Sequence, residues 1–160
     1  MISIERFQDF DTEEVINLVL HFQNDGTRPL VSVEEQPDLL HITEEYMGRG
    51  GYFWVAKEDG NLIGTIGLMP YTKDIAVLKK FFVYENYQGE PNHLGQKLYA
   101  KFLDFAKKKD IKQILLDTPK NTNRAHKFYE KAGFIKVSES ELPISFSHPY
   151  ADCDFFLLKL

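Results

Sequence analysis

The segment from Phe81 to Phe134 constrains the fold of this 160-residue chain more than any other part of it. An apolar strand opens the segment, and a glycine-containing loop at 88–95 leads from that strand into an amphipathic helix. A second strand at 111–118 then returns to a short helix. Where a loop leads from a strand into a helix, unpaired backbone N–H groups lie at the positive end of the helix dipole and bind phosphate. The segment therefore predicts an anion site at the helix start, although a plain strand-to-helix turn has the same pattern.

Hydrophobic periodicity places the other elements on both sides of this segment. Apolar alternation and branched residues predict strands at 1–7, 52–57, 62–69, 75–84, 134–137 and 154–160. Helical spacing predicts helices after Asp11, from Pro37, over 96–109 and over 125–132. The resulting order, β-α-α-β-β-β-α-β-α-β-β, predicts an α/β (α+β) fold in which about four helices flank both faces of a mixed sheet. The length predicts a single domain over residues 1–160.

Two predictions concern the middle strands of this order. Gly64 and Gly67 within one strand predict a bulge or a close approach by another backbone. Lys79 and Lys80 are adjacent in the next strand, where successive side chains point to opposite faces. At most one of these two lysines is therefore expected to face a buried layer.

Composition excludes two classes of protein. The formal net charge of −5 opposes nucleic-acid binding, which requires a basic face or stripe. No apolar run approaches the roughly 20 residues that a membrane span needs. The N-terminus has no basic region followed by an apolar block, as a signal peptide would have. We therefore expect a cytoplasmic protein with no nucleic-acid or membrane partner.

The cysteine and histidine pattern predicts no metal site. The single cysteine, Cys153, cannot form an internal disulfide, and it lies in an apolar strand pattern. A buried, unreactive thiol is therefore expected there. No group of His, Cys and Asp along the sequence has the spacing of metal ligands.

The segment from Phe81 to Phe134 resembles the GNAT superfamily of acyl-CoA-dependent N-acetyltransferases. The last helix carries the motif Ala125-x-x-Phe128-Tyr129-Glu130-Lys131-x-Gly133-Phe134, which matches the family closely. The resemblance covers nearly the whole chain and implies a mostly antiparallel central sheet. The chain also resembles a smaller branch of bacterial acetyltransferases, with which it shares segments 36–39, 53–56 and 141–143.

The glycine loop resembles the family's pyrophosphate loop at its two ends. Gln88-Gly89 matches the start and Leu94-Gly95 matches the end. Between them the loop is two residues longer, and Asn92 or His93 stands where the family has glycine. Glu90 adds a negative charge that opposes an anionic ligand.

The resemblance implies acetyl-CoA as the co-substrate, with its pyrophosphate on the loop amides. It also implies that the strand at Phe82-Val83 separates from its neighbour near Leu116-Thr118, so that the pantetheine arm pairs with exposed main-chain groups. A main-chain N–H near Phe82 or Val83 would polarise the thioester carbonyl. The cofactor-binding residues implied in this way are Phe82, Val83, Gln88, Gly89, Glu90, Asn92, His93, Leu94, Gly95, Gln96, Thr118, Asn123, His126 and Tyr129.

Three residues are candidates for proton transfer. The resemblance makes Tyr129 the general acid for the departing thiolate, because a phenol with a pKa near ~10 is protonated at neutral pH. Glu34 and Glu35 lie in an irregular segment that borders the acceptor cleft in the family, and either is a candidate general base. The alternatives are a core aromatic role for Tyr129 and solvated loop carboxylates for the two glutamates.

The predicted function is transfer of an acetyl group from acetyl-CoA to a primary amine, by direct attack in a ternary complex. The expected acceptor is a small molecule such as an amino acid or a polyamine, and the acidic composition favours a cationic one. The protein is expected to be a monomer or a homodimer. Two alternatives stay open: acetylation of a protein lysine or N-terminus, and a non-catalytic CoA-binding sensor or interaction module.

Overall fold

The computed structural model of the protein describes residues 1–26, 30–120, 122–148 and 152–160. The strands are β1 Ile2–Arg6, β2 Tyr52–Glu58, β3 Asn61–Pro70, β4 Ile75–Val83, β5 Gln113–Pro119, β6 Ile135–Val137 and β7 Cys153–Lys159. The α-helices are α1 Thr12–Gln23, α2 Ile42–Glu45, α3 Leu94–Lys108 and α4 Asn123–Lys131. No helix in these described parts is both long and apolar enough to cross a membrane.

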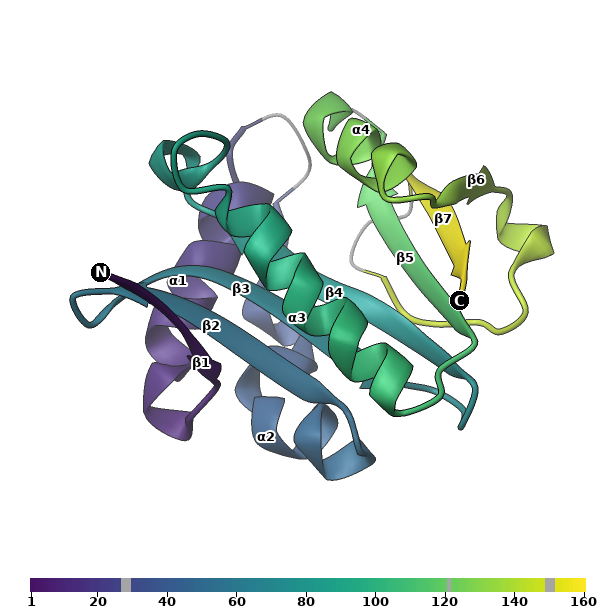
Figure 1. The fold of residues 1–160 in the computed structure, drawn as a ribbon, viewed down its shortest axis with the longest axis horizontal. Coiled ribbons are helices and arrows are strands. Elements are labelled where there is room, and N and C mark those ends of the chain that lie inside the picture. The colour runs from purple at the N-terminus through teal and green to yellow at the C-terminus, as the bar shows by residue number, and fades with distance from the viewer. Residues whose placement is uncertain (27–29, 121, 149–151) are drawn as a thin grey trace.

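The seven strands form one sheet in the order β1-β2-β3-β4-β5-β7-β6 (Figure 1). Neighbouring strands run antiparallel, except that β4 and β5 run parallel. A parallel pair needs a crossover connection, and α3 supplies it between β4 and β5. The predicted element order and the mixed, mostly antiparallel sheet are therefore confirmed.

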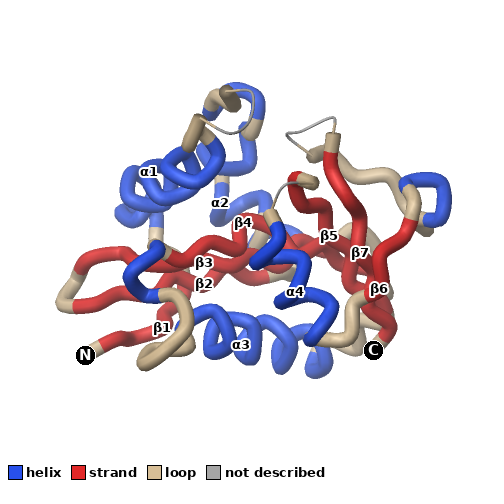
Figure 2. Tube along the Cα trace, turned by 90° about the horizontal axis from the view of Figure 1, so that it is seen from above, coloured by secondary structure: helices blue, strands red, loops and turns tan. Residues whose placement is uncertain are grey.

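Helices cover both faces of this sheet (Figure 2). α3 and α4 lie on one face, and their core includes Trp54, Phe102 and Phe156. α1 and α2 lie on the other face, over a second cluster that includes Phe53. Residues 138–148, between β6 and β7, extend the cover of this second face toward β5 and β7. The sheet is thus buried on both faces at its centre, where β4 and β5 meet.

The prediction of one continuous helix from Pro37 is wrong. The chain forms a 3-10 turn at Pro37–Leu40, then the short helix α2, then another 3-10 turn at Met47–Arg49. The break falls at His41, whose backbone has φ −141° and ψ 46° and is not helical. Sequence periodicity does not report such a break, because the buried side chains on either side of it still recur at helix-like intervals.

β4 contains one residue more than the stretch of β3 with which it pairs. Between the pairs Thr65–Phe82 and Gly67–Lys79, β3 has one residue and β4 has two. The extra residue is Lys80, which has a left-handed φ of 53°, and its carbonyl accepts a hydrogen bond from Thr65 Oγ1 at 2.7 Å. A bulge of this kind shifts the alternation of side chains by one. Lys79 and Lys80 therefore lie on the same face, the one covered by α1 and α2, and the prediction of opposite faces is wrong.

The glycine beside the bulge is closely approached by two aromatic side chains. A Cβ at Gly67 would lie 2.8 Å from ring carbons of both Tyr46 and Phe53, and these rings pack edge to face with centroids 4.9 Å apart. Real Cβ atoms essentially never make such a contact, so only glycine lets both rings pack this closely against β3. The predicted bulge is confirmed by the register shift between Thr65 and Gly67, whereas the closest neighbours of Gly67 are side chains and not another backbone.

Substitution of Gly67 tests this packing. We expect Gly67→Ala to lower the free energy of unfolding by about 1–3 kcal/mol, because the added methyl group must displace two buried rings. Urea denaturation followed by tryptophan fluorescence measures the change. Gly48→Ala is the matched control, since a Cβ there would meet nothing closer than 3.5 Å. Equal stability of the two variants would show that the rings move aside without cost.

Candidate active site

The candidate site begins where β4 and β5 separate. Their pairing consists of three residue pairs and stops at Val77–Leu115, while β5 continues to pair with β7 as far as Pro119. The edge of β4 beyond Val77 is therefore left without a neighbouring strand on the β5 side. A cleft of about 720 Å³ opens at this separation, at the place that the family resemblance implies.

The register shows which main-chain groups of β4 face the cleft. Along a strand, the N–H and C=O groups of successive residues point to alternate edges. The amide of Tyr84 donates to the carbonyl of Ile63 in β3 at 3.1 Å, so the main chain of Val83 points away from β3. Gln88 confirms this direction, because its Nε2 donates to the Val83 carbonyl at 2.8 Å. The Val83 amide thus faces the cleft, whereas Phe82 contributes its side chain, which stacks on Phe22 with ring centroids 5.5 Å apart.

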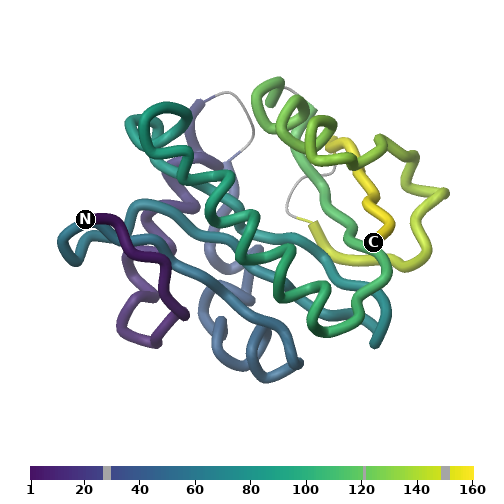
Figure 3. Tube along the Cα trace, in the orientation of Figure 1, coloured from purple at the N-terminus to yellow at the C-terminus, as the bar shows by residue number. Residues whose placement is uncertain are grey.

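The loop after β4 is shaped by two residues with left-handed backbones. Gly89 has φ 66° and His93 has φ 47°, and the His93 amide donates to the Gly89 carbonyl at 2.7 Å. This closed loop ends at the first turn of α3. The amides of the first turn of a helix have no intrahelical acceptor, so those of residues 94–96 are available to a ligand. The loop and α4 lie on opposite sides of the cleft (Figure 3).

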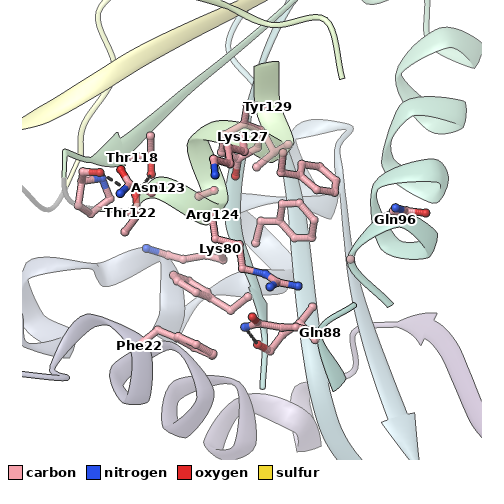
Figure 4. A pocket seen from close by; sticks show the side chains of 18 of the residues that line it. Phe22, Lys80, Gln88, Gln96, Thr118, Thr122, Asn123, Arg124, Lys127 and Tyr129 are labelled. Atoms are coloured by element: carbon pink, nitrogen blue, oxygen red, sulfur yellow. Dashed lines mark hydrogen bonds between the residues drawn. The ribbon is translucent and has the colours of Figure 1, made fainter. Parts of the chain in front are cut away.

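Helix α4 adds positive charge that the sequence analysis missed. Arg124, Lys127 and Lys131 line the cleft, and their spacing of three and four residues places them on one face of the helix. The guanidinium of Arg124 reaches across to the loop, where a Cβ at Gly89 would lie 3.4 Å from Nη2. Figure 4 shows Arg124 beside Gln88 at one end of the pocket, with Lys80 extending away from them. The available sequence signal was the helical spacing of these three cations on the helix that carries Tyr129.

Tyr129 lies in the wall of the same cleft. Its ring packs against Phe81, Phe134 and Phe156, at centroid distances of 6.4, 5.5 and 5.9 Å. Burial among these rings raises the pKa of the Tyr129 hydroxyl above its usual value, and the charge of Asp117 acts in the same direction. The phenol is therefore protonated at neutral pH, as a proton donor must be.

The structure brings most of the predicted cofactor-binding residues together and leaves a few outside. Those that line the cleft are Phe82, Val83, Gln88, Gly89, His93, Gly95, Gln96, Thr118, Asn123 and Tyr129. The others are Glu90, Asn92, Leu94 and His126. The side chain of Leu94 is fully buried in the core, so only its amide remains for a ligand. His126 instead lies with its Nε2 3.2 Å from the Pro119 carbonyl oxygen and 3.7 Å from Asp154 Oδ2.

The two glutamates predicted as general bases lie outside the main cleft. Glu34 and Glu35 belong to a 3-10 turn at Val33–Glu35, and both are exposed. The Glu35 carboxylate accepts a hydrogen bond from Ser32 Oγ at 3.2 Å. Glu35 does line a smaller cavity of about 150 Å³, between the α1–α2 connection and the 138–148 segment. Lys79 and Lys80 line both cavities, so the two meet at the bulge.

Asp117 is a second carboxylate that the sequence analysis did not single out. It lies on β5 and lines the main cleft beside Tyr129. Burial raises the pKa of the Asp117 carboxyl, while the positive charges of Lys79 and Lys80 and the nearby His148 oppose that rise. A carboxylate with a raised pKa is a stronger base than one in water.

Asp117, His148 and Cys153 also form one group of metal-ligating residue types. One ligand atom from each lies within 4.8 Å of the others, and Cys153 Sγ is 3.7 Å from His148 Nδ1. Burial raises the pKa of the Cys153 thiol to about 12, in keeping with the expected unreactive thiol. Asp117 lies on β5, far in sequence from His148 and Cys153, so the spacing along the chain gave no sign of the group. The prediction of no metal stays a prediction.

Comparison with known proteins agrees with this geometry. The model of the "Acetyltransferase (GNAT) family" matches residues 16–134. The chain is 34% identical over 116 residues to "Probable N-acetyltransferase camello" of Xenopus tropicalis, a match covering 71% of this chain and 52% of that protein. It is 31% identical over 126 residues to "N-acetylaspartate synthetase" of the same organism, covering 76% and 46%. The chain thus spans about half the length of these curated relatives.

A solved structure matches over the whole chain. The crystal structure of an acetyltransferase from Streptococcus agalactiae superposes with a TM-score of 0.94 at 33% identity, and covers 99% of this chain and 98% of its own. Family model, relatives and fold agree on one assignment. The chain belongs to the GNAT family of acetyl-CoA-dependent N-acetyltransferases.

Proposed function

We propose that the protein transfers the acetyl group of acetyl-CoA to a primary amine of a small molecule, by direct attack in a ternary complex. The observation that carries this proposal is the open edge of β4, with the Val83 amide and the Tyr129 hydroxyl on the walls of one cleft. A relative named N-acetylaspartate synthetase supports a small acceptor. So does the size of the second cavity, about 150 Å³.

The cleft supplies complementary groups along the length of acetyl-CoA. The amides of residues 94–96 and the Arg124 guanidinium would hold the diphosphate, and Lys127 and Lys131 add positive charge on the same side. The main chain of Val83 would pair with the pantetheine arm as an added strand does. The thioester then lies near the bulge, where the two cavities meet.

Acetyl-CoA supplies an activated acetyl group as a thioester. The Val83 amide polarises the carbonyl oxygen, and the amine nitrogen of the acceptor forms its bond to the carbonyl carbon while the carbon–sulfur bond breaks. Tyr129 donates a hydrogen bond to the departing sulfur and passes it a proton only late in the step, because a thiol with a pKa of about 8.5 is the stronger acid; the proton lost by the amine restores the phenol. The walls of the cleft hold both reactants together, which contributes much of the rate.

The proton that leaves the acceptor amine needs a base. Of the two glutamates predicted from the sequence, Glu35 keeps this proposed role because it lines the second cavity, whereas Glu34 lines neither cavity. Asp117 is an additional candidate, since it lines the main cleft and burial strengthens it as a base. Both carboxylates lie on the side from which an acceptor in the second cavity approaches.

The diphosphate site makes a first prediction. We expect Arg124→Gln to weaken binding of coenzyme A about tenfold, because it removes a charged hydrogen-bond donor from a phosphate. Isothermal titration calorimetry gives the dissociation constant. Arg6→Gln, an exposed change on β1, should bind as the unaltered protein does. Failure of the unaltered protein to bind coenzyme A at millimolar concentration would refute the proposed function itself.

The acid role of Tyr129 makes a second prediction. We expect Tyr129→Phe to lower kcat about a hundredfold with the dissociation constant of acetyl-CoA unchanged, because only the proton donor is lost. Steady-state release of free thiol measures the rate with the best amine of a panel. Tyr99→Phe is the matched control, because the Tyr99 hydroxyl is buried without a hydrogen-bond partner among the described residues. Full activity of Tyr129→Phe would leave Tyr129 a core aromatic.

A further inference from the structure

We propose that the acceptor carries a carboxylate close to its amine, as an amino acid does, and that the ammonium groups of Lys79 and Lys80 hold this carboxylate where the two cavities meet. This inference rests on the proposed function and decides between the two acceptor classes that the sequence left open. A polyamine, which has no anionic group, would be a poor acceptor.

The bulge in β4 creates this pair of cations. In a regular strand, adjacent lysines would point to opposite faces of the sheet. The additional residue of β4 turns Lys80 to the face of Lys79, and both side chains border both cavities. A ligand that reaches from the second cavity toward the thioester must therefore pass two ammonium groups.

Among the described residues, Lys80 has fewer partners than a buried ammonium requires. Its side chain is 6% exposed, and its closest carboxylate, Asp38 Oδ2, lies 4.0 Å away. That same oxygen already accepts the hydroxyl of Tyr46 at 2.7 Å. One hydrogen bond, to Gln36 Oε1 at 2.6 Å, uses one of the three donors of the ammonium. Burial disfavours the charged form of Lys80 and lowers its pKa to about 8. A bound anion would stabilise the charged form.

The position of Lys80 is held by a buried pair of amides. Gln23 Nε2 donates to Gln36 Oε1 at 2.8 Å, and Gln36 Nε2 donates to Gln23 Oε1 at 2.6 Å. This reciprocal pair presents Gln36 Oε1 to the ammonium of Lys80. The ammonium is therefore fixed before any ligand arrives, on a residue that lines both cavities.

The carboxylates of the second cavity each have a hydrogen-bond or ion-pair partner. Glu45 pairs with Arg49 at 2.7 Å, Asp38 accepts from Tyr46, and Glu35 accepts from Ser32. Lys79 donates to the carbonyl of Ser147 at 3.1 Å, and the charge of Asp117 acts on it from the main cleft. Among the described residues, neither Lys79 nor Lys80 thus has a carboxylate at hydrogen-bond distance, and an anion bound between them would supply one.

Asp117 complements the other end of such a ligand. The carboxyl of Asp117 interacts with both lysines and lines the main cleft, on the side of the thioester. An amino acid could place its carboxylate on the lysines and its amine beside Asp117. Opposite charges in the site and the ligand then fix which end of the acceptor meets the acetyl group.

Matched acceptors test the proposal on the unaltered protein. The panel pairs glycine with glycinamide, L-alanine with ethylamine and L-lysine with cadaverine, and adds spermidine. We expect the best α-amino acid to exceed its partner without the α-carboxylate at least tenfold in kcat/KM, because a charge-assisted hydrogen bond is lost. Equal or faster transfer to the partner amine, or to spermidine, would overturn the inference and leave the proposed function intact. Binding of acetyl-CoA without transfer to any amine would overturn both.

Lysine variants test which residues recognise the carboxylate. We expect Lys80→Met to raise the KM of the preferred amino acid about tenfold to a hundredfold, with little change for its partner amine and no change in acetyl-CoA binding. Lys79→Met should have the same effect to a smaller extent, and it is the test if Lys80→Met lowers the melting temperature too far. Lys101→Met, an exposed change on α3, is the control. An unchanged KM for the amino acid in both test variants would overturn the assignment.

Discussion

The short pairing between β4 and β5 is the constraint from which the candidate site follows. After three residue pairs, β5 continues along β7 and β4 continues along β3, so an edge of main chain opens inside the sheet. The bulge at Lys80 lies in this part of β4, held by the hydroxyl of Thr65. It sets the alternation of every residue after it, which points the amide of Val83 into the cleft. A cofactor site and an acceptor site therefore share one distorted strand.

The parts of the fold with strong local signals were predictable from the sequence. The Asp59-Gly60 turn between two apolar strands predicts a hairpin, and both residues have positive φ, 51° and 84°. The loop from Gln88 and the Tyr129 helix are continuous motifs, so the sequence locates them without knowledge of the sheet. The helix expected from Pro37 failed because its buried residues keep a helical spacing across a break in the backbone.

The bulge and the charge clusters could not be predicted, and the reason is physical. A period of two along a strand assumes one residue per rung, and nothing at Lys80 marks an additional residue. Asp117, His148 and Lys79 approach one another only because β5, the 138–148 segment and β4 meet in space. Such a group has no spacing in sequence, since each member comes from a different element.

The charge of the cleft also opposes the charge of the chain. The protein has 24 acidic and 19 basic residues, yet among the described residues five lysine or arginine side chains line the main cleft against one carboxylate, Asp117. A cleft with low-dielectric walls concentrates the field of its own lining residues, and distant surface charges are screened within about 10 Å at moderate salt. The acidic composition of the whole chain therefore does not predict the charge of its ligands. The expectation of a cationic acceptor rested on that composition, and it does not apply to the site. The local excess of positive charge suits a diphosphate at the Arg124 end and a carboxylate at the Lys80 end.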